Sequence, residues 1–175
     1  GFASSPLDTN DLIEMVGGSP LIVKLLEGTQ GKGVVLAETK KAAESVINAF
    51  KSLKANILVQ EFIKEVERGD KRIILLNGEP IGAILRIAKE GSFICNFHSG
   101  GTPRATEITK EDLYICSQIK GFLIENDIFF AGIDIIGGKL TEINITSPTC
   151  VQEINRANKV KLEENVLDFI INKLN

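Results

Sequence analysis

The chain has 175 residues, of which 43% are apolar and 25% are charged, as is usual for a globular protein with one well-packed domain. Its formal net charge of −3, without a run of Lys and Arg or interleaved aromatic residues, disfavours nucleic-acid binding. The three cysteines form no Cys-x-x-Cys pair, which argues against a disulfide framework or a structural zinc site and favours a reducing, cytoplasmic location.

Membrane insertion is not expected, because no apolar stretch is long enough to span a bilayer and no signal-peptide pattern opens the chain. The first residue is Gly1 and not methionine, which indicates a fragment, a processed product or an engineered expression product.

The first third of the chain predicts a small α/β unit. A helix is expected over residues 5–17, where Asp8 or Thr9 can serve as N-cap, and the apolar spacing of residues 39–53 predicts a second helix. Three apolar runs are expected to form strands, at residues 21–26, 34–37 and 57–61.

The rest of the chain predicts an antiparallel sheet and two further helices. Asn77 and Gly78 form a strong hairpin signal between two apolar runs, and Thr109 is expected to begin a helix with acidic residues in its first turn. The expected strands are residues 71–76, 80–87 and 92–97, and the expected closing helix is residues 160–174.

A hairpin within residues 131–150 is expected to bring three oxygen-bearing side chains together. Glu142 and Asn144 are two positions apart and share one face of a strand, and a glycine turn folds the strand of Asp134 back beside them. These oxygens suit Mg²⁺ that also binds nucleotide phosphates better than they suit zinc. The alternative is a solvated acidic edge.

The register of this hairpin constrains its turn. With only Gly137 and Gly138 in the loop of a regular hairpin, Asp134 would face Thr141 and lie out of phase with Glu142. A three-residue loop of Gly137, Gly138 and Lys139 would place Asp134 opposite Glu142. We therefore predict the longer loop.

A glycine-rich segment, E-G-T-Q-G-K-G, joins two expected strands at residues 27–33. Its backbone N–H groups are able to surround phosphate oxygens, although the segment is not a Walker loop because Val34 follows Gly33. A plain hairpin turn is the alternative. Lys24, the only charge in its apolar run, either meets an anion such as a nucleotide phosphate or is an edge-strand lysine that reaches solvent.

Two arginines, Arg72 and Arg86, lie on adjacent expected strands and are suited to bidentate recognition of phosphate or carboxylate. A solvated sheet face is the alternative. His98 is the only histidine and is interpreted as structural, and no Ser-His-Asp set or activated cysteine is evident. Nucleophilic hydrolase chemistry is therefore disfavoured.

Taken together, these segments resemble the ATP-grasp ligases. Residues 1–65 are similar to ribosomal-protein glutamate ligases through V-G-G-S-P-L-I-V-K-L-L-E-G-T-Q-G-K-G-V-V-L-A-E-T and L-V-Q-E-F-I-K-E. From residue 67 the sequence resembles bacterial glutathione synthetase through G-D-K-R-I-I-L-L-N-G-E-P, I-D-I-I-G and L-T-E-I-N-I-T-S-P-T-C. The last motif is specific, whereas the glycine loop alone is not.

The resemblance implies an α+β fold, in which two α+β subdomains with mostly antiparallel sheets clasp a nucleotide. A single ATP-grasp domain is expected over residues 1–175, with a smaller subdomain at 1–60 and a larger one, carrying the metal hairpin, at 61–175. The N-terminal substrate domain of these enzymes and an upstream ATP-binding lysine have no counterpart in the chain.

The resemblance also implies site residues. Arg72 and Arg86 are the implied catalytic residues, facing the phosphoryl group or the substrate carboxylate, and Asp70 is the implied ribose contact. The implied ATP-binding set comprises Lys24, Gly28, Gln30, Gly31, Gly33, Glu61, Ile63, Asp70 and Asn96. Asp134, Glu142 and Asn144 would hold Mg²⁺, with Mn²⁺ as an alternative, and Ser147 and Thr149 would lie near the substrate.

The implied chemistry is phosphorylation of a carboxylate by ATP to an acyl phosphate, followed by attack of an amine. The leading hypothesis is a glutathione-synthetase-like ligase, and the alternatives are a glutamate ligase acting on a protein or peptide and a non-catalytic ATP-binding or interaction module. The expected partner is a small amino acid or peptide, and a homo-oligomer is compatible with the sequence.

Two positions depart from the resemblance. Ile94 and Gln152 stand where arginines are usual in these enzymes, Ile94 in both groups and Gln152 in glutathione synthetase. Two anion contacts are therefore missing, and binding would survive such losses better than turnover.

Overall fold

The computed structural model describes residues 7–28 and 32–174. Contacts divide the chain into two compact units, of which the first ends at Lys64 and the second begins at Glu65. Each unit has its own sheet and its own hydrophobic core. Among the described residues, no helix has both the length and the apolar character needed to cross a bilayer.

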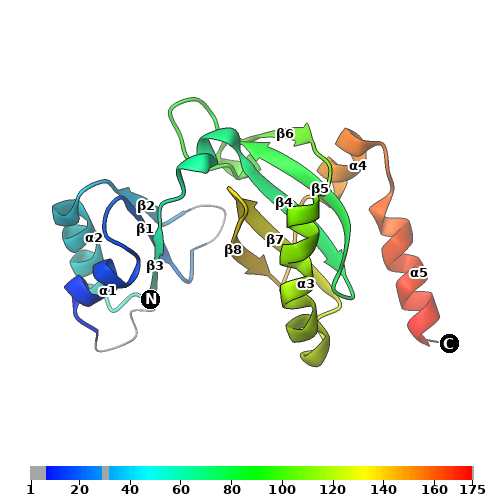
Figure 1. Cartoon of the computed structure of the whole chain (residues 1–175), viewed down its shortest axis with the longest axis horizontal. Helices are drawn as coiled ribbons and strands as arrows, with labels where there is room; N and C mark the ends of the chain where they lie inside the picture. The colour runs from blue at the N-terminus through cyan, green and yellow to red at the C-terminus, as the bar shows by residue number, and fades with distance from the viewer. Residues whose placement is uncertain (1–6, 29–31, 175) are drawn as a thin grey trace. The chain divides into compact units, whose positions relative to one another are not determined.

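The first unit is an antiparallel three-stranded sheet with two helices (Figure 1). The elements are α1 (Thr9–Met15), β1 (Leu21–Leu25), β2 (Val34–Ala37), α2 (Lys40–Ser52) and β3 (Ile57–Glu61). Asp8 caps α1 through Asn10 N at 2.7 Å, and Thr39 caps α2 through Ala42 N at 3.2 Å. Since β1 lies between β2 and β3, the edge-strand interpretation of Lys24 is wrong.

The second unit is built on a five-stranded antiparallel sheet in the order β6-β5-β4-β7-β8 (Figure 1). Its strands are β4 (Asp70–Leu76), β5 (Glu79–Ile87), β6 (Thr102–Ala105), β7 (Phe130–Ile136) and β8 (Lys139–Asn144). Its helices are α3 (Lys110–Glu125), α4 (Val151–Asn158) and α5 (Leu162–Leu174), with short 3-10 turns at Lys64–Arg68 and Phe97–Ser99.

The two faces of this sheet have different chemistry. On one face, Ile73 and Ile133 pack with Leu123 of α3. On the other face, Ile74 and Ile84 pack with α4 and with the first residue of α5. Because successive side chains alternate across a strand, the face that carries Ile74 also carries the charged residues at positions 70 and 72 of β4. One half of this face is therefore apolar and the other half is ionic.

Helix α3 is fixed to the sheet by a buried acidic residue. Thr109 and Asp112 form a reciprocal capping box, with Asp112 N donating to Thr109 Oγ1 at 3.2 Å and Thr109 N donating to Asp112 Oδ2 at 2.8 Å. Lys71 Nζ of β4 donates to the same Asp112 oxygen at 2.6 Å. The helix start expected at Thr109 is confirmed.

The β7–β8 hairpin differs from the predicted one in its turn. Ile136 pairs with Lys139, so the loop contains only Gly137 and Gly138, both with positive φ, and the three-residue loop is wrong. The register shifts by one residue between Asp134 and Ile135, because Thr141 is an extra residue in β8. This bulge, and not a longer turn, places Asp134 opposite Glu142 as predicted.

Two other expectations need correction. Residues 92–97 contain no strand, because the ladder beside β5 is made by Thr102–Ala105, and Cys95 is instead buried with its Sγ 4.0 Å from the Val66 carbonyl. Helix α4 was not expected. It follows Cys150, whose φ of +90° lies in the left-handed region, and no side-chain cap marks its start.

The closing helix is present as α5, but most of its apolar surface is exposed. Leu162 is its only buried residue, while Phe169 packs against Phe129 with ring centroids 5.8 Å apart. Four apolar residues of α5 are at least 45% exposed: Leu167, Ile170, Ile171 and Leu174. Their spacing of three and four residues forms one stripe along the helix.

We expect the core of the second unit, and not the α5 stripe, to determine its stability. Ile133→Ala should lower the free energy of unfolding by about 2–5 kcal/mol, because Ile133 is fully buried and its removal leaves a cavity. Leu167→Ala should change it by less than about 0.5 kcal/mol, because that side chain is 57% exposed. Urea unfolding of both variants measures the difference, and equal losses would contradict the assignment.

Candidate active site

Three neighbouring strands of the second unit, β5, β4 and β7, assemble an ionic cluster, which we define as Asp70, Arg72, Arg86 and Asp134. Pairing places Asp70 opposite Arg86, Arg72 opposite Asp134, and Asp134 opposite Glu142. All four cluster residues are at most 8% exposed. The alternative of a solvated sheet face is therefore wrong for both arginines, and the alternative of a solvated acidic edge is wrong for Asp134.

Arg72 binds the Asp134 carboxylate in a bidentate manner. Its Nε donates to Oδ1, and its Nη2 donates to Oδ2 at 2.9 Å. Its Nη1 lies 3.5 Å from the main-chain oxygen of Thr149. Gly132 makes room for this side chain, because a Cβ there would lie 2.9 Å from Pro148 Cβ and 3.3 Å from Arg72 Cδ. The two-pronged geometry matches the fork of the guanidinium to the carboxylate.

Arg86 is shared between two carboxylates. Its Nη2 donates to Asp70 Oδ2 at 2.5 Å and lies 2.9 Å from Asp134 Oδ2. Arg86 is 3% exposed and cannot be solvated in place of these contacts. Within the described residues, Arg86 Nε and Asp70 Oδ1 are buried polar atoms that lack a hydrogen-bond partner.

The two aspartates differ in their electrostatic environment. Burial opposes ionisation of Asp134, but the hydrogen bond from Arg72 and the charges of Arg86 and Arg72 outweigh it and lower its pKa. Burial, and then the negative charge of Asp134, raise the pKa of Asp70 to about 7, although Arg86 acts in the opposite direction. Asp134 therefore remains ionised and Asp70 takes up the proton as the pH falls.

Glu142 and Asn144 extend the cluster along β8. With its amide oriented by its partners, Asn144 donates to Glu142 Oε1 at 2.9 Å and accepts from Arg72 Nη2 at 3.2 Å. Glu142 is exposed and Asn144 is half-buried. Arg72 thus links Asp134 to the two predicted β8 ligands.

The residues of the predicted metal set fit Mg²⁺ in donor chemistry. Among residues 7–28 and 32–174, no cluster of three or more His, Cys, Asp and Glu side chains is suited to hold a metal ion. Asp134, Glu142 and Asn144 supply only two carboxylates and one amide oxygen. Such a set suits a Mg²⁺ ion that keeps several water ligands and also binds phosphate oxygens of a nucleotide. Both oxygens of Asp134 already accept from arginines, so a metal would share that carboxylate with Arg72 and Arg86.

The segment after β8 contacts the cluster at Arg72. Ser147 and Thr149, the predicted substrate residues, are exposed, and Cys150 is buried. Thr149 approaches Arg72 through its main-chain oxygen, a contact that side-chain chemistry in the sequence does not reveal. Burial raises the pKa of Cys95 and Cys116 to about 11 and also raises that of Cys150, so no thiol is activated among the described cysteines.

The predicted nucleotide residues of the first unit lie on or beside its sheet. Lys24 is half-buried in β1, Glu61 is exposed at the end of β3, and Ile63 is half-buried after it. Gly28 and Gly33 lie between β1 and β2 in the chain, and a Cβ on Gly28 would lie 2.4 Å from Lys32 O. Gln30 and Gly31 lie outside the described residues.

Three further positions belong to the second unit: the predicted ATP-binding residue Asn96, and Ile94 and Gln152, which stand where arginines are usual in the resembling enzymes. Asn96 precedes the 3-10 turn Phe97–Ser99 and caps it without a side-chain hydrogen bond, and the turn contains His98. Ile94 is half-buried with its N–H donating to Ser92 Oγ at 3.1 Å, while Gln152 is exposed on α4.

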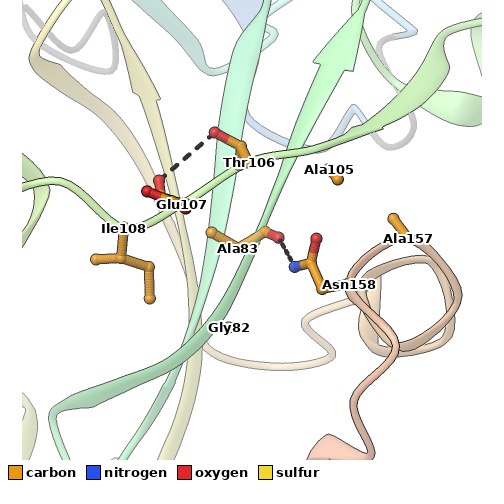
Figure 2. A pocket seen from close by; sticks show the side chains of 8 residues that line it. All are labelled: Gly82, Ala83, Ala105, Thr106, Glu107, Ile108, Ala157 and Asn158. Carbon is orange, nitrogen blue, oxygen red and sulfur yellow. Dashed lines mark hydrogen bonds between the residues drawn. The ribbon is translucent and has the colours of Figure 1, made fainter.

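A separate hollow of about 600 Å³ lies beside the part of β5 that β6 does not cover (Figure 2). Gly82 and Ala83 of β5 are among the residues that line it, and Asn158 Nδ2 donates to the Ala83 carbonyl at 2.8 Å. No residue of the predicted nucleotide, metal or substrate sets lines this hollow. Asn158 instead satisfies an edge carbonyl of β5.

Asp70 should make the stability of the protein depend on pH. Its pKa is raised from 3.8 to about 7, so between these values the folded state holds more protons than the unfolded state. The free energy of unfolding should therefore fall as the pH rises through this window, by up to about 1.4 kcal/mol for each pH unit. Asp70→Asn should remove this decline.

Urea unfolding at several pH values gives the free energy of unfolding of each protein. The slope of this free energy against pH is then compared between the unaltered chain and Asp70→Asn. The pKa of Asp134 is lowered from 3.8, so Asp134 changes the free energy of unfolding only below about pH 3.8. This range does not overlap the window of Asp70. Identical slopes for the two proteins would contradict the shift assigned to Asp70.

Comparisons with known proteins identify the family of the chain. The family described as "Prokaryotic glutathione synthetase, ATP-grasp domain" matches residues 8–159. A "Probable alpha-L-glutamate ligase" of Shewanella halifaxensis is 48% identical over 178 residues, which cover 99% of this chain and 38% of that protein. One of the same name from Parasynechococcus marenigrum is 55% identical over 148 residues, covering 82% of this chain and 31% of that protein.

A solved structure of D-alanine–D-alanine ligase from Bacillus anthracis shares the architecture. Its TM-score is 0.66 at 15% identity, and the match covers 98% of this chain and 60% of that one. The chain spans less than half the length of the two relatives named above. Because the family match covers most of the sequence and the two-sheet architecture recurs in this neighbour, the chain belongs to the prokaryotic glutathione synthetase ATP-grasp domain family and has the α+β ATP-grasp fold.

Proposed function

We propose that this chain is the ATP-binding domain of a ligase that joins a carboxylate to an amine, with L-glutamate as one of the substrates. The observation that carries the proposal is the buried cluster in which Arg72 and Arg86 bracket Asp134, beside Glu142 and Asn144. Cationic groups of fixed orientation and an oxygen ligand set are what phosphoryl transfer requires.

Each group in the proposed site has a distinct task. Asp134, Glu142 and Asn144 would hold Mg²⁺, which neutralises charge on the nucleotide phosphates. Arg72 orients Asp134 and Asn144, and Arg86 offers its buried Nε to an anionic group of the substrates. In the first unit, Lys24 and the backbone around Gly28 and Gly33 would bind phosphate. No side-chain nucleophile is needed for this chemistry.

Glutamate is preferred as a substrate because the relatives of 48% and 55% identity carry the name of glutamate ligases. A second candidate is glutathione synthesis, which the family description and the L-T-E-I-N-I-T-S-P-T-C motif favour. A cytoplasmic location and a peptide or amino-acid partner accompany either activity. Substitution of the family arginines by Ile94 and Gln152 favours a third candidate, a nucleotide-binding module without turnover.

Release of ADP from Mg·ATP separates these candidates. We expect ADP with L-glutamate and a peptide acceptor, and none with γ-glutamylcysteine and glycine. The reverse pattern would establish the glutathione candidate. Binding of Mg·ATP without ADP from either substrate pair would establish the non-catalytic one.

The metal set should control nucleotide affinity. Without a cation, the carboxylates of Asp134 and Glu142 repel a polyphosphate, so ATP binding should require Mg²⁺. Glu142→Gln keeps the shape of the side chain and removes its charge, so the variant should lose most of this Mg²⁺ dependence. Its melting temperature without ligand should stay level or rise slightly.

Calorimetric titration of ATP with Mg²⁺ and then with EDTA measures this dependence. Glu125→Gln, an exposed carboxylate at the end of α3, is the matched control and should keep the full metal effect. Equal ATP binding in EDTA and Mg²⁺ by the unaltered chain would refute the metal assignment.

A further inference from the structure

The outer side of α3 carries an exposed and largely apolar surface, which we call the α3 face. Its members recur at intervals of three and four residues, and all of them are exposed. They are Leu113, Tyr114, Ser117, Gly121 and Ile124. The three large side chains, Leu113, Tyr114 and Ile124, are 49%, 66% and 44% exposed. The opposite side of the helix packs on the five-stranded sheet (Figure 1), so the α3 face is left without a covering element.

Gly121, in the middle of the α3 face, is not explained by packing within the chain. A glycine inside a helix is destabilising relative to alanine, and a Cβ at Gly121 would meet no described atom within 4 Å beyond the backbone of its own helix. Ser117, one turn earlier, is also small, and its hydroxyl donates to the Tyr114 carbonyl of the same helix at 2.6 Å. The middle of the α3 face would therefore allow another helix to approach closely.

The order of residues along the α3 face is nearly symmetric. Large apolar side chains lie at both ends, and the two small residues lie between them. If two copies of α3 pack antiparallel about a two-fold axis level with Ile119, Tyr114 of each copy lies beside Ile124 of the other. Ser117 of each copy then lies beside Gly121 of the other. The α3 face is thus complementary to itself in shape.

Charges at the two ends of α3 favour the antiparallel arrangement. Lys110 begins the helix and Glu125 ends it, which is the reverse of what the helix dipole favours. Both are exposed, and among the described residues neither has an ion-pair partner. In the antiparallel pair, Lys110 lies about 4.5 Å along the axis from Glu125 of the second copy, a distance that a lysine side chain spans. A parallel pair would instead bring like charges together.

We propose that two copies of this chain form a two-fold dimer through the α3 face, with the helices antiparallel and Lys110 of each copy paired with Glu125 of the other. Helix α3 covers the side of the sheet that carries Ile133, whereas Arg72 and Asp134 lie on the other side. The dimer therefore leaves the ionic cluster uncovered. Self-association is independent of the ligase activity proposed above.

Charge reversal tests the pairing of the two copies. Sedimentation of the 175-residue chain should show a dimer in equilibrium with the monomer. Lys110→Glu and Glu125→Lys should each weaken the dimer about tenfold, because each brings like charges together at both ends of the pair. Combining the two changes restores opposite charges, so the double variant should regain the dimer affinity to within about threefold.

Two further measurements exclude loss of folding as the cause. At concentrations where only the monomer is present, neither Lys110→Glu nor Glu125→Lys should lower the melting temperature, because each change suits the dipole of α3. Lys40→Glu is the matched control, since Lys40 is exposed and begins α2 as Lys110 begins α3. This control should leave the dimer unchanged.

Gly121→Leu separates close helix packing from general apolar attraction. The added side chain enlarges the apolar surface of the α3 face, so unspecific association would become tighter. In the proposed dimer the same side chain lies where the two helices cross, beside Ser117 of the second copy, so the dimer should be lost. The melting temperature of the monomer should stay level or rise, because leucine favours a helix more than glycine does.

Three results would overturn the proposal. A chain that stays monomeric at its highest soluble concentration would overturn the dimer. Tighter association of Gly121→Leu would overturn the close contact of the helices, and a double charge variant that dimerises as weakly as the single ones would overturn the antiparallel pairing. Since none of these measurements uses nucleotide, the dimer stands or falls separately from the proposed function.

Discussion

The buried carboxylate of Asp134, held by two arginines, is the interaction on which the charged part of the second unit's sheet depends. Two guanidinium groups and two carboxylates lie on one sheet face with little access to water. Burying such charges is costly unless each has a partner, and removal of one partner of a buried pair typically costs about 3–5 kcal/mol. The cluster is therefore maintained as a unit.

The strands around this carboxylate hold it in place by ordinary backbone geometry. Arg72 reaches Asp134 because the two residues are direct partners in the β4–β7 ladder, and Gly132 leaves space for the arginine stem. Glu142 faces Asp134 because Thr141 adds one residue to β8. A site built on paired strands keeps its side chains in closer register than one built on loops.

The same sheet face also explains how a polar site coexists with a stable core. Beyond the cluster, Ile74 and Ile84 are covered by α4 and by Leu162. The opposite face is covered by α3, which Lys71 and Asp112 fix in position. The charged residues thus occupy part of one face, while the apolar surface needed for folding remains contiguous.

The sequence alone determined the elements whose signals are local. Apolar periodicity and caps predicted α1, α2 and α3 to within a few residues, because Asp8, Thr39 and Thr109 are caps by their own chemistry. Asn77 and Gly78 likewise predicted the β4–β5 hairpin, and spacing alone placed Glu142 and Asn144 on one face. The resemblance to ATP-grasp ligases, carried by the β7–β8 motif, identified the fold.

Tertiary structure decided the features that depend on distant partners. Residues 92–97 have the apolar character of a strand, but Thr102–Ala105 occupies the place beside β5, and no local signal distinguishes the two. The bulge at Thr141 and the left-handed conformation of Cys150 are set by pairing and packing. The burial of Arg72 and Arg86, and the choice of Asp70 as the partner of Arg86, also depend on ladders between residues far apart in the chain, because a charged side chain is buried only where its counter-charge meets it.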